Sequence, residues 1–184
     1  KIMEGAFCNS GQDCMAASRV YAAKEIHDDL LASLVPAVEA LKVGGPADEA
    51  SEMGPVITPV QRDRVNGFLE RAKATGHVDL QHGGEGDNAD GFFVPPTVVV
   101  GAEQHDEIVQ KEVFGPVVSI TSFDQNDDVL AWANEVEYGL ASSIFTTDAA
   151  RALDLARRLQ FGTVWINDHL PVVPEMPHGG FKQS

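Results

Sequence analysis

The sequence has few cysteines, few basic residues and no long apolar run, and each shortage excludes a class of protein. Cys8 and Cys14 do not make a disulfide framework, and their separation does not match a zinc finger. A reducing, cytoplasmic setting fits this cysteine content. The 13 Lys and Arg stand against 28 Asp and Glu, which gives a formal charge of −15. Such a chain repels phosphate backbones and anionic lipid, so we expect neither nucleic acid nor a membrane as a partner.

The stretches without charged residues are too short to cross a membrane. The longest, such as residues 92–102 and 113–123, contain Gly or Pro and fall well below the roughly 20 apolar residues that a membrane span needs. The first residues show no basic start followed by an apolar run, so no signal peptide is expected.

What is present is enough apolar sequence for one ordinary core. Hydrophobic residues make up 43% of the chain and charged residues 22%. Apolar residues at helical spacing predict helices over 26–42, after Thr58, near residue 124 and after Thr147. Runs rich in Val, Ile, Phe and Thr predict strands at 19–23, 78–80, 92–100, 117–123, 142–146 and 163–167. Because helices and strands alternate, we predict an α/β fold with a largely parallel twisted sheet flanked by helices.

Three of these helices carry specific expectations. Thr58 and Pro59 have the form of a helix cap followed by proline at the first helical position. Pro36 is expected to kink the helix over 26–42. In the helix after Thr147, four residues are expected to face inward: Ala149, Ala152, Leu153 and Ala156.

Nucleotide-binding and metal-binding motifs are not convincing in this sequence. Gly84, Gly86 and Ala89 have the spacing of a dinucleotide fingerprint, but that motif must open a helix. Here acidic residues and a strand-like run follow, so we interpret residues 83–91 as an ordinary loop. The six histidines show no i, i+4 pair and no cysteine nearby, so no metal site is expected.

Cys14 stands out because of the segment around it. Residues 7–14 form a polar, glycine-containing turn that leads into residues 15–18, a short helix-compatible segment. A thiol in the first turn of a helix faces unpaired N–H groups and the positive end of the helix dipole, which favours the thiolate. The same N–H groups, that of Cys14 included, can hold an oxyanion. The alternative is a buried cysteine that only fills space; Cys8 is interpreted as structural.

Residues 7–14, with Asn9, Gly11, Gln12 and Cys14 in the pattern N-x-G-Q-x-C, closely resemble the active-site cysteine signature of the NAD(P)-dependent aldehyde dehydrogenase superfamily. Further motifs of that family follow in order: Gly54-Pro55, Pro96-Thr97, Lys111 to Pro116 (E-x-F-G-P), Asn134 with Tyr138 to Leu140, Asn167, and Pro177 to Ser184 (P-x-G-G-x-K-x-S). The resemblance covers essentially the whole chain.

The resemblance implies roles for individual residues. Cys14 would be the nucleophile that adds to an aldehyde to give a thiohemiacetal, and its N–H would be one oxyanion donor. Glu112 would bond the ribose of the nicotinamide half of NAD or NADP, and Phe114 would pack beside that ribose or ring. Without the motif, Glu112 would be interpreted as a surface carboxylate and Phe114 as a core residue. Asn167 and Gly179-Gly180 would shape the site.

The resemblance also implies a domain organisation. In the family, a cofactor-binding domain precedes the catalytic domain and supplies most NAD(P) contacts, the glutamate that activates water and an asparagine oxyanion donor. Residues 1–184 would then be the catalytic domain, without that amino-terminal domain and without the carboxyl-terminal oligomerisation segment. We expect the chain alone to be inactive, and the full-length enzyme to be a homo-oligomer.

Acidic residues near the expected site suggest a cationic aldehyde as substrate. Asp13 is next to Cys14, and two more acids lie in residues 168–178, which border the substrate tunnel in this family. Carboxylates suit an ammonium or guanidinium group, and aromatic rings add contact with a cation. The predicted substrate-binding residues are Asp13, Asn167, Asp168, Glu175 and His178. Residues 169–180 resemble the aminobutyraldehyde branch of the betaine- and aminoaldehyde-type enzymes, so 4-aminobutanal is expected; the alternative is that these acids are solvated loop charges.

Two other functions stay open at this point. A thiol hydrolase or amidase would pair Cys14 with His169 or His178, and it would need an imidazole within hydrogen-bond reach of the sulfur. A non-catalytic scaffold module would need no nucleophile. The presence of a nucleophile in this setting argues against a scaffold; the residues concerned are Asn9, Gln12, Cys14 and Glu112.

Overall fold

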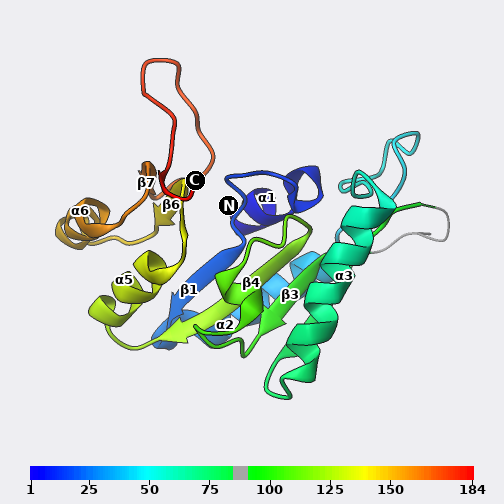
Figure 1. Cartoon of the computed structure of the whole chain (residues 1–184), viewed down its shortest axis with the longest axis horizontal. Coiled ribbons are helices and arrows are strands. Elements are labelled where there is room, and N and C mark those ends of the chain that lie inside the picture. Colours follow the sequence, from blue (N-terminus) through cyan, green and yellow to red (C-terminus); the bar gives the residue numbers. More distant parts are fainter. Residues whose placement is uncertain (85–90) are drawn as a thin grey trace. The chain divides into compact units, whose positions relative to one another are not determined.

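The computed structural model describes residues 1–84 and 91–184, which form two compact units (Figure 1). The sheet unit comprises Ile2–Phe123, and the C-terminal unit comprises Asp124–Ser184 together with Lys1. The loop expected at residues 83–91 lies mostly outside the described residues, as do Gly86 and Ala89. In the described ranges, no helix is long and apolar enough to cross a membrane.

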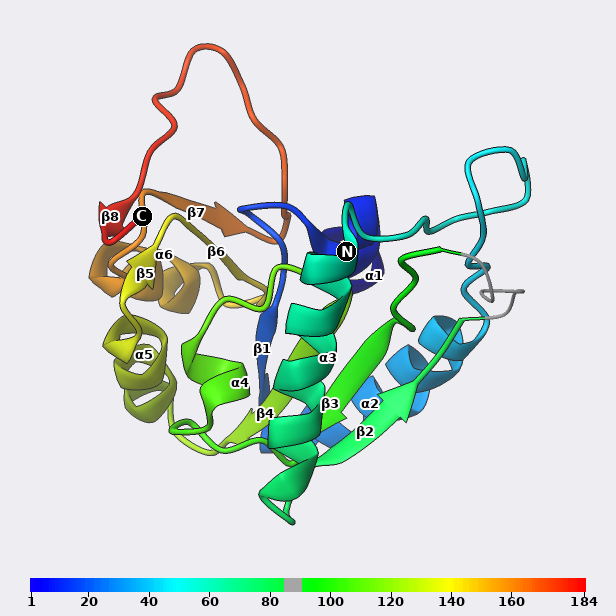
Figure 2. The ribbon, with the colours of Figure 1, turned by 45° about the vertical axis from the view of Figure 1, so that its right-hand side comes forward.

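The sheet unit is built on a four-stranded sheet with the strand order β1-β4-β3-β2 (Figure 2). The strands are β1 (Arg19–Ala23), β2 (Asp79–His82), β3 (Thr97–Val100) and β4 (Val117–Phe123). β4 pairs in parallel with both β1 and β3, and β2 pairs antiparallel with β3. Val98, Val118 and Ile120 are fully buried, which is typical of strands covered on both faces. The predicted α/β fold with a largely parallel sheet is confirmed.

Helices α2 (Lys24–Glu39) and α3 (Pro59–Ala74) pack on opposite faces of this sheet (Figure 2). Successive residues of a strand point to opposite faces, so neighbouring valines of β3 belong to different cores. Val99 packs in the core that contains α3, and Val98 packs in the core that contains α2 and α1 (Ile2–Phe7). The sheet unit therefore consists of three layers, with the sheet between two apolar cores.

Local sequence signals explain where α3 begins. The Thr58 hydroxyl accepts a hydrogen bond from the N–H of Gln61 at 3.2 Å, and Pro59 is the first helical residue. The cap satisfies one of the N–H groups that a helix start leaves open, which confirms the prediction for this segment. Pro36 lies inside α2, which continues to Glu39.

The C-terminal unit combines short helices with two small sheets. The helices are α5 (Asn126–Glu135) and α6 (Ala149–Arg158). β6 (Ala141–Ile144) pairs in parallel with β7 (Thr163–Ile166), and β5 (Tyr138–Gly139) pairs antiparallel with β8 (Phe181–Lys182). In α6, Ala152 is buried as expected and Ala156 is half-buried, but Ala149 is exposed and Leu153 is 52% exposed, so the expectation is wrong for these two residues. The next residue of a helix lies about 100° around the axis, and only the side that carries Ala152 is covered.

Candidate active site

Cys14 lies on an exposed turn between α1 and β1. The backbone oxygen of Asp13 accepts a hydrogen bond from the N–H of Ala16 at 3.1 Å, and the Asp13 carboxylate accepts one from the N–H of Met15 at 2.7 Å. These bonds close a single turn, and residues 15–18 form no helix. The prediction that a helix dipole faces Cys14 is therefore wrong, because the chain leaves this turn directly for β1.

The backbone N–H of Cys14 is nevertheless available. Within the described ranges it has no hydrogen-bond acceptor, whereas the N–H groups of Met15 and Ala16 are engaged. The Cys14 side chain is exposed, as is that of Cys8, so it does not fill space in a core. An available N–H beside an exposed thiol can stabilise the oxyanion that forms when the thiolate attacks a carbonyl.

The chain just before Cys14 makes a left-handed turn. Asn9, Ser10 and Gly11 have φ angles of 49°, 57° and 69°, and the N–H of Gln12 donates to the Asn9 oxygen at 3.1 Å. Glycine and, less readily, asparagine adopt this conformation, but for serine it is strained. Ser10 is held there because its buried hydroxyl donates to the backbone oxygen of Gly54 at 2.8 Å.

Two further contacts fix the cysteine loop to other motifs. The side-chain oxygen of Gln12 accepts a hydrogen bond from the N–H of Ile57 at 3.0 Å. Gly11 lies so close to Gly115 that a Cβ on Gly11 would overlap the Gly115 carbonyl group. The segments around Gly54-Pro55 and Gly115-Pro116, which are far apart in sequence, therefore both brace the loop that carries the thiol.

Glu112 and Phe114 lie in the segment between α4 (Glu107–Gln110) and β4. Glu112 is exposed, and among the described residues its carboxylate has no hydrogen-bond partner. A carboxylate in this state can accept hydrogen bonds from the hydroxyls of a sugar. Phe114 is half-buried and has a φ of 57°. The segment therefore presents an open carboxylate two residues from a partly exposed ring.

Sequence reasoning missed two residues that hold this segment. Gln61 and Arg64, on the first turns of α3, donate to the backbone oxygens of Glu112, Val113 and Phe114. Their spacing of i, i+3 places both on one face of the helix, which is visible in the sequence. The backbone oxygens that they bind are about 50 residues away in the sequence, and no local periodicity reveals such distant contacts.

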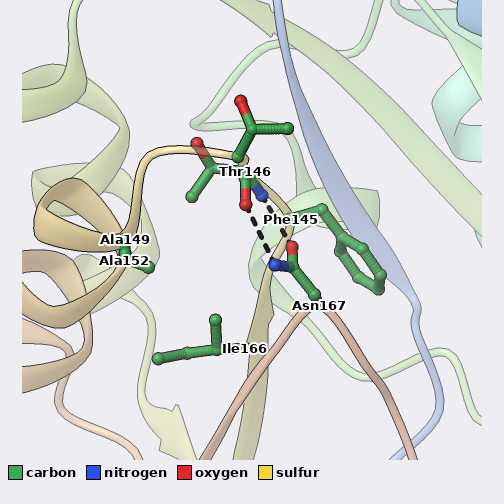
Figure 3. Close-up of a pocket in the computed structure, with 7 residues that line it drawn as sticks. Phe145, Thr146, Ala149, Ala152, Ile166 and Asn167 are labelled. Atoms are coloured by element: carbon green, nitrogen blue, oxygen red, sulfur yellow. Dashed lines mark hydrogen bonds between the residues drawn. The ribbon is translucent and has the colours of Figure 1, made fainter.

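Asn167 follows β7 and binds the backbone of Thr146 (Figure 3). Its side-chain oxygen accepts from the Thr146 N–H at 2.9 Å, and its amide donates to the Thr146 oxygen at 3.0 Å. Both residues line an open hollow of about 420 Å³, together with Phe145, Thr147, Ala149, Ala152 and Ile166. Because both ends of its amide are engaged, Asn167 shapes this hollow.

The other substrate-binding candidates differ in how they are engaged. Asp13 belongs to the sheet unit, where its carboxylate supports the turn of Cys14. The Asp168 carboxylate accepts from the His169 N–H at 2.8 Å and pairs with the Lys1 ammonium at 3.0 Å. The hydrogen bond from His169, and secondly Lys1, lower the pKa of Asp168.

Glu175 and His178 lie on an exposed loop, residues 171–178, which projects from the C-terminal unit (Figure 2). Neither side chain forms a hydrogen bond or an ion pair with any described residue. Unlike Asp168, the Glu175 carboxylate therefore has no cation beside it in this part of the chain. Glu175 is the one acid of residues 171–178, and its carboxylate is open to solvent.

His169 is engaged inside the C-terminal unit. Its ring is 7% exposed, its Nδ1 lies 2.7 Å from the Ser143 hydroxyl, and it packs edge-on against Trp165. Such an environment is typical of a structural histidine and disfavours the pairing with Cys14 that a thiol hydrolase would need. In the described ranges, no group of three or more His, Cys, Asp or Glu side chains could hold a metal ion.

Together, the fold and the site define an α/β protein with an exposed cysteine thiol on a braced loop. The family model for "Aldehyde dehydrogenase family" matches residues 1–184. The chain belongs to the aldehyde dehydrogenase family.

Similar proteins and structures agree with this membership. Betaine aldehyde dehydrogenases from Rhizobium johnstonii and Sinorhizobium fredii are 39% and 38% identical to it over 184 residues, which is 99% of this chain and 38% of each relative. The NAD+ complex of an aldehyde dehydrogenase from Bacillus cereus matches with a TM-score of 0.94 at 35% identity. A double mutant of betaine aldehyde dehydrogenase from Staphylococcus aureus, in complex with NAD+, matches at 0.93 and 36%. Each structural match covers 99% of this chain and 37% of the other.

Proposed function

We propose that this chain carries the catalytic cysteine of an NAD(P)-dependent aldehyde dehydrogenase that oxidises an aldehyde to a carboxylic acid. The observation that carries the proposal is the position of Cys14, an exposed thiol with an available N–H on a loop braced by two other family motifs. Family membership supports the same activity. The chain spans 38% of the length of the curated relatives it matches, so the activity belongs to the full-length protein.

The residues of this chain have separate tasks in that reaction. The thiolate of Cys14 adds to the aldehyde carbon, and the carbonyl oxygen becomes an oxyanion that the Cys14 N–H stabilises. Glu112 accepts hydrogen bonds from ribose hydroxyls, and Phe114 packs beside the same part of the cofactor. When bound, NAD(P)+ would supply the acceptor for the hydride that leaves the thiohemiacetal carbon, and water would then hydrolyse the thioester left on Cys14. The NAD+ complexes among the structural neighbours support this cofactor.

We propose a cationic aldehyde as substrate, such as the aminoaldehyde 4-aminobutanal. The relatives are named betaine aldehyde dehydrogenases, and betaine aldehyde carries a quaternary ammonium group, which supports a cationic substrate. Of the acids predicted to bind it, Asp13 and Asp168 already have partners, and Glu175 has none among the described residues. Glu175 is therefore the leading candidate for the contact with the ammonium group.

The remaining features belong to the full-length protein. Most contacts to NAD(P), the base that activates water and the second oxyanion donor would come from a separate cofactor-binding domain. We propose that the full-length enzyme is a cytoplasmic homo-oligomer and that residues 1–184 alone are inactive. Two exposed cysteines that form no disulfide support a reducing compartment.

Replacement of Cys14 in the full-length protein tests the proposed activity. We expect Cys14→Ala to lower aldehyde-dependent NAD(P)H formation by at least roughly 10³-fold, because no other group replaces the nucleophile. Cys8→Ala is the matched control and should keep the activity. A thiol hydrolase would instead show cofactor-free ester or amide hydrolysis that His178→Ala abolishes, and that result would replace the proposal.

A further inference from the structure

Three consecutive backbone oxygens of the Glu112–Phe114 segment are held by two side chains of α3. Arg64 donates to the Glu112 oxygen at 2.6 Å and also to the Val113 oxygen. Gln61 donates to the Phe114 oxygen at 2.6 Å and to the Val113 oxygen at 3.3 Å. This is a dense set of side-chain contacts for a segment that lies outside any helix or strand.

The segment needs such support because of its backbone. Phe114 has a φ of 57°, in the left-handed region that a non-glycine residue occupies only when its surroundings enforce it. The next residue, Gly115, lies against Gly11 of the cysteine loop. Backbone strain of this kind persists only where surrounding contacts hold it, and it often occurs at functional sites. The strained Phe114 backbone is therefore consistent with a functional role for this segment.

The same end of α3 is also tied to the cysteine loop. Ile57, two residues before the first residue of α3, donates its N–H to the side-chain oxygen of Gln12 at 3.0 Å. Thr58 then caps the helix by accepting from the Gln61 N–H. The start of α3 thus contacts the nucleophile loop through its backbone and the Glu112–Phe114 segment through its side chains.

We infer that Gln61 and Arg64 are positioning residues that hold the Glu112 carboxylate and the Phe114 ring where a nicotinamide cofactor meets them. They act through the backbone oxygens of residues 112–114. This inference rests on the proposed function, because it assigns a purpose to Glu112 and Phe114 as cofactor contacts. Arg64 suits the task because its planar guanidinium reaches two oxygens at once and also stacks on Phe68 at 5.0 Å.

The test uses the full-length protein with Gln61→Met and Arg64→Met, which keep much of the side-chain length but remove the donors. Arg62→Met is the matched control, because Arg62 lies on the same turn and its side chain pairs with the neighbouring Asp63. Arg64→Lys keeps the charge but lacks the planar guanidinium group. Its NAD+ binding should therefore lie between that of Arg64→Met and that of the wild type. Thermal unfolding checks that each variant is folded.

Two readouts separate positioning from a general loss of structure. Calorimetric titration should show NAD+ binding roughly 10-fold weaker in both Met variants, as loss of a hydrogen bond worth about 1.4 kcal/mol would produce. Amide hydrogen exchange of residues 111–116, measured without cofactor, should become faster in the same variants. The KM for the aldehyde should stay within about twofold, because the donors do not hold Cys14 itself.

Glu112→Gln distinguishes failure of the inference from failure of the proposed function. If Glu112→Gln weakens NAD+ binding but both Met variants bind and exchange like the wild type, the inference is overturned and the proposed function stands. If the wild-type full-length protein binds neither NAD+ nor NADP+, both are overturned. Faster exchange and weaker binding in the Met variants, with Arg62→Met unchanged, support the inference.

Discussion

The α-carbon of Gly11 faces the backbone of Gly115 with no room for a side chain between them. A Cβ built on Gly11 would overlap the Gly115 carbonyl group and lie 2.9 Å from the nitrogen of Pro116. Gly11 also has a φ of 69°, which side chains disfavour. The nucleophile loop and Gly115-Pro116 therefore meet through backbone atoms, and this contact requires glycine at position 11.

We expect Gly11→Ala to destabilise the protein by about 2 kcal/mol or more, because it combines a left-handed backbone with a clash against backbone atoms. Urea unfolding of the variant and the wild type measures the difference. Gly45→Ala is the matched control, because a Cβ there meets no atom within 4 Å and Gly45 has no positive φ. A Gly11→Ala protein as stable as the Gly45→Ala protein would contradict the packing.

The strands β1 and β4 could be predicted because most of their residues are apolar or β-branched. Residues 19–23 and 117–123 were expected as strands, and β1 and β4 have those bounds. The strand expected at 92–100 is shorter, because only Thr97–Val100 pair in the sheet. Two-residue strands such as β5 and β8 carry no periodicity, so nothing in the sequence distinguishes them from loop. The prediction of a helix after Cys14 is wrong, because hydrogen bonds to Asp13 close only a single turn there.

The candidate site also has a part that the sequence can predict and a part that it cannot. Cys14, Glu112 and Phe114 could be proposed as site residues because each lies in a local motif. The left-handed conformation of Ser10 could not, because it depends on a hydrogen bond to Gly54, which is 44 residues away. Contacts between distant segments leave no local pattern in a single sequence, and they decide how the site is held.

His77 and Asp106 form an ion pair that makes stability depend on pH. The His77 Nε2 lies 2.8 Å from the Asp106 carboxylate, and this hydrogen bond is the main reason that the pKa of His77 is raised. A raised pKa means that the folded state favours protonated His77. The stabilisation is therefore full below about pH 6.5, the unfolded value, and is lost as the pH rises through the folded pKa.

The variant His77→Asn should therefore lower the Tm more at about pH 5.5 than at about pH 9. Thermal unfolding followed by circular dichroism at the two pH values measures this. His178→Asn is the control, because its exposed ring has no hydrogen bond to any described residue and the Tm should not change. An equal loss of Tm for His77→Asn at both pH values would show that the pair is not ionised.

The chain of 184 residues by itself should not oxidise aldehydes. It carries Cys14, but it spans 38% of the length of its relatives, and by family resemblance the water-activating base and most cofactor contacts lie elsewhere. NADH absorbance with the purified chain, NAD+ and 4-aminobutanal measures the activity. Full-length protein under the same conditions is the positive control. Turnover by the purified chain above that of its Cys14→Ala variant would refute this expectation.

Removal of the Glu175 charge tests the proposed contact with a cationic aldehyde. In the full-length enzyme, we expect Glu175→Gln to lower kcat/KM for 4-aminobutanal roughly 10-fold and to leave the value for butanal unchanged, because only the first substrate carries a charge. Steady-state kinetics with both aldehydes at two salt concentrations measures the effect, which should shrink as salt screens the attraction.

Two controls complete this experiment. Glu70→Gln removes an exposed carboxylate of the sheet unit and should change neither substrate. Asp168→Asn should have a smaller effect than Glu175→Gln, because Lys1 already balances the Asp168 charge at 3.0 Å. If Glu175→Gln affects both aldehydes equally, the loop acid is a solvated charge, and the preference for a cation must come from residues outside this loop.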